Sequence, residues 1–281
     1  MKNQIVVITG STRGLGYAIA ETMLKQGATV VISGRSPEAL RRAVKKLSPF
    51  GAVTGRRCDV RQERQVYAMA RWVVAHHGGI DVWINNAGTS ASAGRILDMP
   101  PHQALEMFMT NDMGTFYGAR AALHFMLPRG HGTLVNVYGN GSFLRPATPT
   151  ALYGASKAWM TSFSRSLAKE VNGSGVHIVG FSPGMLLTDM LTAPTVLGQA
   201  GRDMLKNYGF VLRLLSRPPE WAAEKLVSLL RTNRREFVEY RGFKPWTPLA
   251  ALVRIGWENL TATGNRPKYK LKVLPPYRPK I

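Results

Sequence analysis

The segment IVVITGSTRGLGYAIAETML, residues 5–24, joins a short apolar run, a glycine-rich loop and a helix-like stretch. Gly10, Gly14 and Gly16 are spaced as Gly-x-x-x-Gly-x-Gly in the loop. Glycine permits a tight turn and a close backbone approach to a pyrophosphate, and the amides that open the following helix attract such an anion. A strand, a glycine loop and a helix in this order predict the first unit of a dinucleotide-binding fold.

The same alternation of short apolar runs and longer helical stretches continues along the chain. Strands are predicted at residues 5–8, 29–32, 53–57, 80–84, 134–137 and 177–181, with a last strand in EFVEYRG, residues 236–242. Helices are predicted at residues 14–26, 37–47, 61–76, 101–127 and 153–171, and after Pro218 and Pro219. Strands alternating with helices indicate an α/β protein with a doubly wound parallel sheet.

The C-terminal part of the chain follows a different pattern. We expect one domain over residues 1–242, with a mobile substrate lid at about 183–217, and a basic C-terminal extension over 243–281. Residues 247–260 have helical spacing of apolar positions, which predicts a short amphipathic helix. The tail from residue 265 is rich in Pro and Lys, and we expect no regular structure there.

Composition limits the classes of function. The chain has 281 residues, with 37 Lys and Arg against 16 Asp and Glu and a net charge of +21. This charge favours anionic partners, although no nucleic-acid-binding motif is present. Cys58 is the only cysteine, which fits a reducing compartment. We find no signal peptide or spanning segment and expect a cytoplasmic protein, with room for peripheral contact with an anionic membrane.

The residues after the second apolar run bear on the choice of cofactor. Ser33, Gly34, Arg35 and Ser36 stand where a free ribose 2′-hydroxyl would require an acidic acceptor. Arg35 and Arg13 can instead bind a 2′-phosphate through charge-assisted hydrogen bonds. We therefore expect NADP(H) rather than NAD(H), the alternative being two ordinary surface arginines.

Six short motifs in order over residues 4–190 resemble the short-chain dehydrogenase/reductase family. They are TGSTRGLG (9–16), CDV (58–60), NNAG (85–88), Asn111 within MTNDMGTF, YGASK (153–157) and SPGM (182–185). The resemblance implies a nicotinamide cofactor, which the arginines indicate to be NADP(H), and no histidine or other residue is marked as a metal ligand. The implied cofactor-binding residues are Gly10, Ser11, Thr12, Arg13, Gly14, Leu15, Gly16, Arg35, Asp59, Val60, Asn86, Ala87, Gly88, Tyr153, Lys157, Pro183, Gly184 and Thr188.

The proton chemistry of a carbonyl reduction fits Tyr153 and Lys157. Tyr153 can donate a proton to the substrate oxygen, but an unperturbed tyrosine has a pKa of about 10. Lys157 lies four residues later on the same helical face, and its ammonium favours the tyrosinate and lowers that pKa. The resemblance implies that Asn111 holds a water linking Lys157 to solvent.

The family's substrate-binding serine has no obvious counterpart. It usually lies thirteen residues before the tyrosine, which is Asn140 here, and counting from the strand gives Gly139. Ser142 is the candidate that we favour as a catalytic residue, because the glycines of the GNGS turn give the backbone freedom to bring it into the same space. The Asn140 amide is an alternative donor, and Thr148 and Thr150 are weaker ones.

The segment NVYGNGSFLRPATPTALYGASK, residues 136–157, is similar to that of the chlorophyll(ide) b reductases, a subgroup acting in chlorophyll catabolism. This resemblance implies reduction of the C7 formyl group of chlorophyll b or its chlorophyllide. Met185, Leu186, Leu187, Met190 and Leu191 stand at the family's lid, with ordinary packing as the alternative. Other lipophilic ketones or alcohols, and an inactive cofactor-binding scaffold, stay open. By analogy, the helices near 101–127 and 153–171 are expected to form an oligomer.

Overall fold

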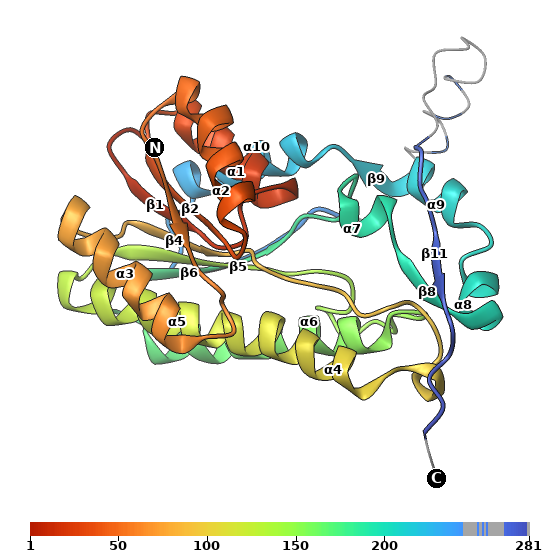
Figure 1. Ribbon diagram of the computed structural model, residues 1–281. Helices are drawn as coiled ribbons and strands as arrows, with labels where there is room; N and C mark the ends of the chain where they lie inside the picture. The colour runs from red at the N-terminus through yellow and green to blue at the C-terminus, as the bar shows by residue number, and fades with distance from the viewer. Residues whose placement is uncertain (244–251, 253–254, 256, 258–266, 280–281) are drawn as a thin grey trace.

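A sheet of seven parallel strands forms the centre of the molecule (Figure 1). The computed structural model describes residues 1–243, 252, 255, 257 and 267–279. The strands are β1 (Ile5–Ile8), β2 (Thr29–Gly34), β3 (Val53–Arg57), β4 (Val82–Asn85), β5 (Gly132–Val137), β6 (Val176–Ser182) and β10 (Phe237–Arg241). Their spatial order is β10-β6-β5-β4-β1-β2-β3. From β1 the chain adds strands toward one edge and then, from β4, toward the other edge, so the strand order reverses between β1 and β4. Ligands of such sheets bind outside the carboxyl ends of the strands at this reversal.

Two layers of helices bury the sheet. One face packs against α1 (Gly14–Lys25), α2 (Pro37–Leu47) and α10 (Pro219–Thr232). The other packs against α3 (Glu63–His77), α5 (Gly114–Met126) and α6 (Ala151–Glu170). The remaining helical pieces are α4 (Pro101–Met107), the π-helical segment η3 (Phe108–Met113) and the 3-10 turns η1 (Ser48–Phe50), η2 (Ile96–Asp98) and η4 (Leu127–Arg129). Because both faces are covered, the central strands are mostly apolar.

The predicted doubly wound parallel sheet is confirmed, and each strand predicted from the sequence is present. The start of α2 shows how local sequence sets an element: the Ser36 hydroxyl accepts a hydrogen bond from the Ala39 amide at 3.2 Å, and Pro37 occupies the first turn. The helix predicted over 101–127 is interrupted by η3, where one turn widens. This widening changes which side chains of the helix point inward.

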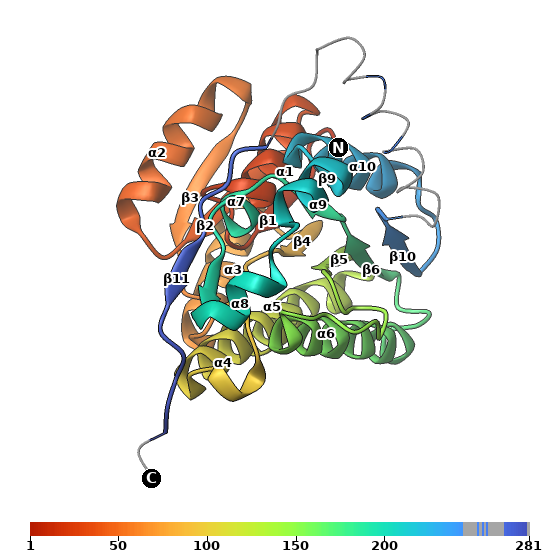
Figure 2. The same cartoon turned by 90° about the vertical axis from the view of Figure 1, so that its right-hand side faces the viewer.

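The predicted lid, between β6 and α10, contains several short helices and strands. They are β7 (Met185–Leu186), α7 (Asp189–Thr192), β8 (Thr195–Leu197), α8 (Gly198–Met204), α9 (Tyr208–Leu215) and β9 (Ser216–Arg217). Strand β7 pairs with β9, so the two ends of the lid are joined close to the sheet. Figure 1 shows these elements gathered at the right-hand side of the molecule, and in Figure 2 they face the viewer above α4 and α6.

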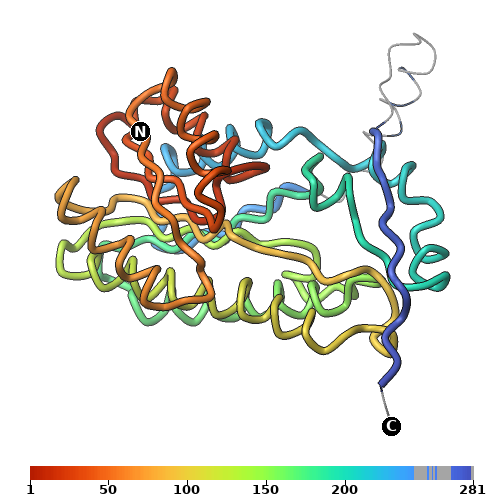
Figure 3. Tube along the Cα trace, viewed as in Figure 1, coloured from red at the N-terminus to blue at the C-terminus, as the bar shows by residue number. Residues whose placement is uncertain are grey.

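The prediction that the tail lacks regular structure is wrong at β11 (Lys272–Leu274). This strand pairs in parallel with β8, and the Lys272 amide donates to the Pro194 carbonyl at 3.0 Å. Figure 3 follows the tail as it runs beside the lid. The physical reason is long-range: a Lys-Val-Leu segment becomes a strand once an unpaired edge is offered to it. The helix predicted over 247–260 falls almost entirely outside the described residues.

Candidate active site

The glycines of the first loop are required by close contacts with the end of β4. Gly10 has φ +61°, and a Cβ there would lie 2.7 Å from the Ala87 Cα. A Cβ on Gly16 would lie 2.4 Å from the Asn86 side-chain nitrogen and 2.8 Å from the Gly10 carbonyl oxygen. The loop and the NNAG segment are therefore in direct contact, and larger residues at Gly10 or Gly16 would separate them.

Side chains of the same segments hold the loop in place. The Asn86 amide donates to the carbonyls of Thr9 and Gly10 at 2.9 and 3.0 Å. The Ser11 hydroxyl donates to the Ile8 carbonyl at 2.7 Å and accepts from the Ser33 amide at 2.9 Å. These two predicted cofactor residues thus use their side chains to position the loop. The first turn of α1, with no side-chain cap, keeps its backbone amides directed out of the helix end.

The predicted adenosine end carries several arginines. Arg13 forms an exposed ion pair with Asp189 of α7 at 2.7 Å, and Arg35 lies 3.9 Å from Glu106. The Asp59 carboxylate is bound by Arg61, whose hydrogen bonds hold the pKa of Asp59 below its usual range.

Three neighbouring side chains of the predicted cofactor set lie in packed positions. Val60 is buried, and a Cβ on Gly114 would lie 2.8 Å from one of its methyl groups. Thr12 lies against Gly34, where a Cβ would lie 2.7 Å from the Thr12 methyl group. Leu15 packs against the core under α1. Their side chains therefore help to shape the loop.

Tyr153 and Lys157 come together one turn apart on α6. The Lys157 ammonium is buried, donates to the Val137 carbonyl at 3.0 Å and lies 5.6 Å from the centre of the Tyr153 ring. Burial raises the pKa of Tyr153 to about 12 and lowers that of Lys157 to about 8. Tyr153 is thus protonated at neutral pH, as a proton donor requires.

Asn111 lies at the same place but uses its side chain for structure. Its carboxamide oxygen accepts from the Thr89 amide at 2.8 Å, and its nitrogen donates to the Thr89 carbonyl at 2.9 Å and to the Ser156 hydroxyl at 3.1 Å. A Cβ on Gly88 would lie 3.4 Å from the Asn111 oxygen and 3.9 Å from the Lys157 nitrogen. Gly88, Asn111 and Lys157 therefore lie next to one another.

The GNGS turn places Gly139, not a serine, against the tyrosine hydroxyl. A Cβ on Gly139 would lie 2.4 Å from the Tyr153 hydroxyl oxygen. The buried Ser142 hydroxyl accepts a hydrogen bond from the Gly139 amide at 3.0 Å, which leaves its own proton to donate. Gly141 has φ +94°, and a Cβ there would lie 2.4 Å from the Gly154 Cα, so this glycine lets the turn lie on α6.

The other candidates for the serine's role are placed less favourably. Asn140 is exposed, and so is Thr148. The Thr150 hydroxyl donates to the Ala147 carbonyl at 3.0 Å within the turn before α6. Of these side chains, the Ser142 hydroxyl is held one hydrogen bond from the residue that faces Tyr153.

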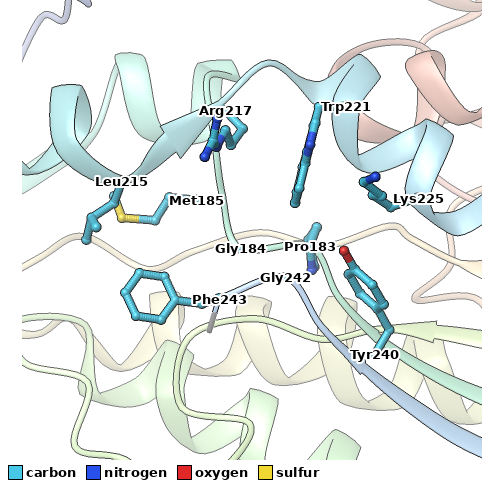
Figure 4. Close-up of a pocket in the computed structure, with 10 residues that line it drawn as sticks. All are labelled: Pro183, Gly184, Met185, Leu215, Arg217, Trp221, Lys225, Tyr240, Gly242 and Phe243. Carbon is cyan, nitrogen blue, oxygen red and sulfur yellow. The ribbon is translucent and has the colours of Figure 1, made fainter. Parts of the chain in front are cut away.

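The loop after β6 extends the site toward the lid. Thr188 lies over the start of α1, where a Cβ on Gly14 would lie 3.5 Å from the Thr188 methyl group. Pro183 and Gly184 form one wall of a cavity of about 330 Å³ that Trp221, Tyr240 and other side chains complete (Figure 4). Tyr153, Lys157 and Ser142 do not line this cavity.

The predicted lid residues divide between core and surface. Leu186 is buried in the core shared with α1 and α10, whereas Met190 is 39% exposed. Met185 lines the cavity shown in Figure 4, and Leu187 and Leu191 are half-buried. The alternative of ordinary packing therefore holds for Leu186.

Sequence reasoning missed a set of buried polar side chains that fix α6 to the sheet. The Asn85 amide donates to the Asn136 carboxamide oxygen at 2.9 Å, and the Asn136 amide donates to the Ser164 hydroxyl at 2.8 Å. Asn85 and Asn136 were detectable as asparagines within apolar strands, because buried polar groups need partners. Asp112 was also missed, although it directly follows Asn111 in η3.

Comparison with known proteins places the chain among oxidoreductases. Residues 4–195 match the family model described as short chain dehydrogenase. The chloroplastic chlorophyll(ide) b reductase NOL of Arabidopsis thaliana is 33% identical over 265 residues, which cover 89% of this chain and 74% of that protein. NOL of Oryza sativa subsp. japonica is 38% identical over 237 residues, which cover 80% of this chain and 66% of that protein.

Solved structures of similar fold include proteins with bound nicotinamide cofactors. A metagenomic short-chain oxidoreductase in complex with NADP aligns with a TM-score of 0.68 and 25% identity, over 87% of this chain and 99% of that one. An actinorhodin polyketide ketoreductase with NADPH aligns with a TM-score of 0.73 and 25% identity, over 86% of this chain and 98% of that one.

Proposed function

Because this chain belongs to the short-chain dehydrogenase/reductase family, we propose that it reduces a carbonyl group on a large lipophilic substrate with NADPH. The substrate that we propose is chlorophyll b or its chlorophyllide, whose C7 formyl group would become hydroxymethyl. The observation that carries the proposal is the meeting of the Tyr153 hydroxyl with the Gly139–Ser142 turn. The similarity to chlorophyll(ide) b reductases over most of the chain supports the choice of substrate.

The residues at the first βα junction fit the family's nicotinamide dinucleotide cofactor. Gly10 and Gly16 let the loop lie directly against the end of β4, and the first amides of α1 supply donors for a pyrophosphate. When bound, this cofactor supplies the hydride. Gly14 and Thr188 would border it on the lid side, and Gly88 on the β4 side.

Arg13 and Arg35 are the proposed contacts of the NADPH 2′-phosphate. Arg13 would exchange its ion pair with Asp189 for the phosphate. Both partners of that pair are mostly exposed, and such pairs contribute about 1 kcal/mol or less, so the exchange costs little. A phosphate oxygen accepts stronger, charge-assisted hydrogen bonds from a guanidinium.

Tyr153 would protonate the substrate oxygen while the Ser142 hydroxyl holds that oxygen. At neutral pH Tyr153 carries its proton, since burial raises its pKa to about 12. The Lys157 ammonium near the ring would favour release of that proton by stabilising the tyrosinate. Ser142 donates to the carbonyl oxygen, and the Gly139 amide fixes the direction of its hydroxyl.

Exposed apolar side chains near this turn and in the lid support a lipophilic substrate. Leu144, two residues after Ser142, is 84% exposed with φ +59°. Met190 on α7 is also exposed. An exposed leucine held in a strained conformation contributes little to folding, which favours a role in contact with an apolar ligand.

The test incubates the protein with NADPH and chlorophyllide b and follows the absorption spectrum for loss of the formyl group. We expect formyl reduction with the wild type and none with Tyr153→Phe. Turnover of a simple lipophilic ketone without formyl reduction would transfer the proposal to another lipophilic carbonyl substrate. NADPH binding without turnover of either would identify the chain as an inactive scaffold.

Two further proposals concern association. No helix of the described residues combines the length and apolar character needed to cross a bilayer. We propose peripheral contact with anionic lipid, supported by the net charge of +21, and vesicle co-sedimentation with and without phosphatidylglycerol tests it.

We also propose a homo-oligomer through α5 and α6, supported by the half-buried rings of Phe116, Trp159 and Phe163, and sedimentation velocity tests it.

A further inference from the structure

Asp112 is a buried carboxyl group beside the proposed catalytic pair that the mechanism above does not use. It is 3% exposed, and its Oδ1 atom has no hydrogen-bond partner. A buried carboxyl oxygen without a partner is costly and rarely kept without a role. Its role therefore depends on which neighbouring group its charge keeps protonated.

The π-helical segment η3 explains why Asp112 points inward. Successive side chains of a regular α-helix are about 100° apart, so the helix presents one narrow stripe to its neighbours. In η3 both Asn111 and Asp112 are buried, and the segment packs against α6. Wide turns of this kind are frequent at functional sites. The widened turn therefore places two polar side chains next to α6.

Asp112 and Lys157 come from adjoining positions of η3 and α6, because the Asn111 side-chain amide, one residue before Asp112, donates to the Ser156 hydroxyl, one residue before Lys157, at 3.1 Å. Among the charges of the described residues, Asp112 is the one whose field changes the pKa of Lys157, and it raises that pKa against the lowering effect of burial. In return, Lys157 is the charge that lowers the pKa of Asp112, which burial raises to about 7. Tyr153, one turn earlier on α6, is another titratable side chain beside Lys157. The ammonium itself donates to the Val137 carbonyl at 3.0 Å and to the Met160 sulfur at 3.6 Å.

We propose that Asp112 is a positioning residue whose carboxylate keeps the buried Lys157 ammonium protonated at and just above neutral pH. This inference rests on the proposed role of Lys157 in carbonyl reduction. A buried ammonium without a counter-charge loses its proton, because desolvation penalises the charged form. Without the ammonium, Tyr153 loses the charge that stabilises its tyrosinate, and proton transfer slows.

The sign of the effect follows from the same charges. Removing the Asp112 carboxylate removes a field that raises the pKa of Lys157, so Lys157 would lose its proton at lower pH. Any influence of that carboxylate on Tyr153 has the same sign, since an anion raises the pKa of every neighbouring group. The alkaline limb of the pH–rate profile must therefore move to lower pH. Because Asp112 and Lys157 interact, they titrate as a coupled pair, and the measured shift in midpoint is a property of both groups.

The test compares the wild type with Asp112→Asn, which keeps the shape and removes the charge. The first readout is the titration of Lys157 in the free protein labelled with ¹³C-lysine, its signal assigned from Lys157→Arg. We expect the midpoint to fall by about one pH unit. The second readout is the pH profile of kcat, whose alkaline limb should fall by the same amount, so that kcat one unit above the new midpoint is about tenfold below the variant's own plateau.

Matched variants separate this role from a general structural one. Asp81→Asn removes another partly buried carboxylate, which accepts from the Ile5 amide at 2.8 Å at the opposite end of the sheet, and should leave the limb unchanged. Asp112→Glu restores the charge and should move the limb back. If Asp112→Asn does not fold, Asp112→Ser removes the charge with a smaller side chain.

The outcomes are distinct. An unchanged Lys157 midpoint in the Asn or Ser variant, or an equal shift in Asp81→Asn, overturns the role of Asp112. A lowered midpoint in a protein that reduces no carbonyl would retain the electrostatic pairing and reject the proposed reductase function instead.

Discussion

Replacing Gly139 with alanine is expected to abolish most of the activity while leaving the fold intact. The added Cβ would lie 2.4 Å from the Tyr153 hydroxyl oxygen, 3.0 Å from its Cζ and 3.1 Å from the Lys157 Cγ. An ordinary carbon–oxygen contact is about 3.5 Å, so the tyrosine hydroxyl must move by roughly 1 Å. A misplacement of about 1 Å at a reacting group costs on the order of 100-fold in rate. We expect kcat/KM to fall by about that factor.

The assay separates chemistry from binding and folding. Steady-state reduction gives kcat/KM, NADPH fluorescence titration gives the cofactor Kd, and thermal unfolding gives the stability. Overpacking of this kind costs about 1–3 kcal/mol, so a measurable but incomplete loss of stability is expected. Gly173→Ala is the control: its φ is +77° with no atom within 4 Å of the added Cβ, so it should cost stability without affecting kcat.

The serine variant at the same position sharpens the test. Gly139→Ser places the family's usual residue near the tyrosine, and it meets the same collision as alanine. Activity equal to or above that of the wild type in Gly139→Ser or Gly139→Ala would refute the reasoning, since the turn would then have room for a side chain. In that case the GNGS turn would simply lack the family's serine, and Ser142 would not take over its role.

The remaining predictions use other parts of the site. Ser142→Ala should lower kcat about 100-fold with the cofactor Kd unchanged, and full activity would transfer the role to Asn140. The double variant of Arg13 and Arg35 to alanine should weaken NADPH binding at least tenfold without affecting NADH, as isothermal titration would measure; an equal loss for both cofactors would rule out 2′-phosphate contacts. Lys272→Pro removes the amide that pairs the tail with the lid and should speed limited proteolysis of the lid, whereas unchanged cleavage would mean that β11 does not hold it.

Much of the fold was predictable because its signals are local. The strand-loop-helix segment at residues 5–24, the apolar runs and the proline start of α10 each follow from neighbouring residues alone. The tail strand β11 was not predictable, because its hydrogen bonds come from β8, some 75 residues earlier in the chain. The π-helical turn η3 was equally hidden, since no local residue type requires it.

The residues of the candidate site also divide into features that the sequence predicted and features that only the structure shows. The Tyr153 and Lys157 spacing identified the pair, but not that Lys157 is buried and donates to the Val137 carbonyl. Counting along the chain offered both Asn140 and Gly139 in place of the serine. The fold puts Gly139 against the tyrosine, because Gly141 lets the turn lie on the Gly154 backbone.

The sequence by itself determined the sheet, the cofactor loop and the chemical class of the site, because repeating patterns and short motifs encode local geometry. The tertiary structure alone decided which groups meet: Gly139 with Tyr153, and Asp112 with Lys157. Both meetings join different elements of the fold, the second across residues 45 positions apart. Their energies depend on burial and on the distance between charges, which a sequence does not contain.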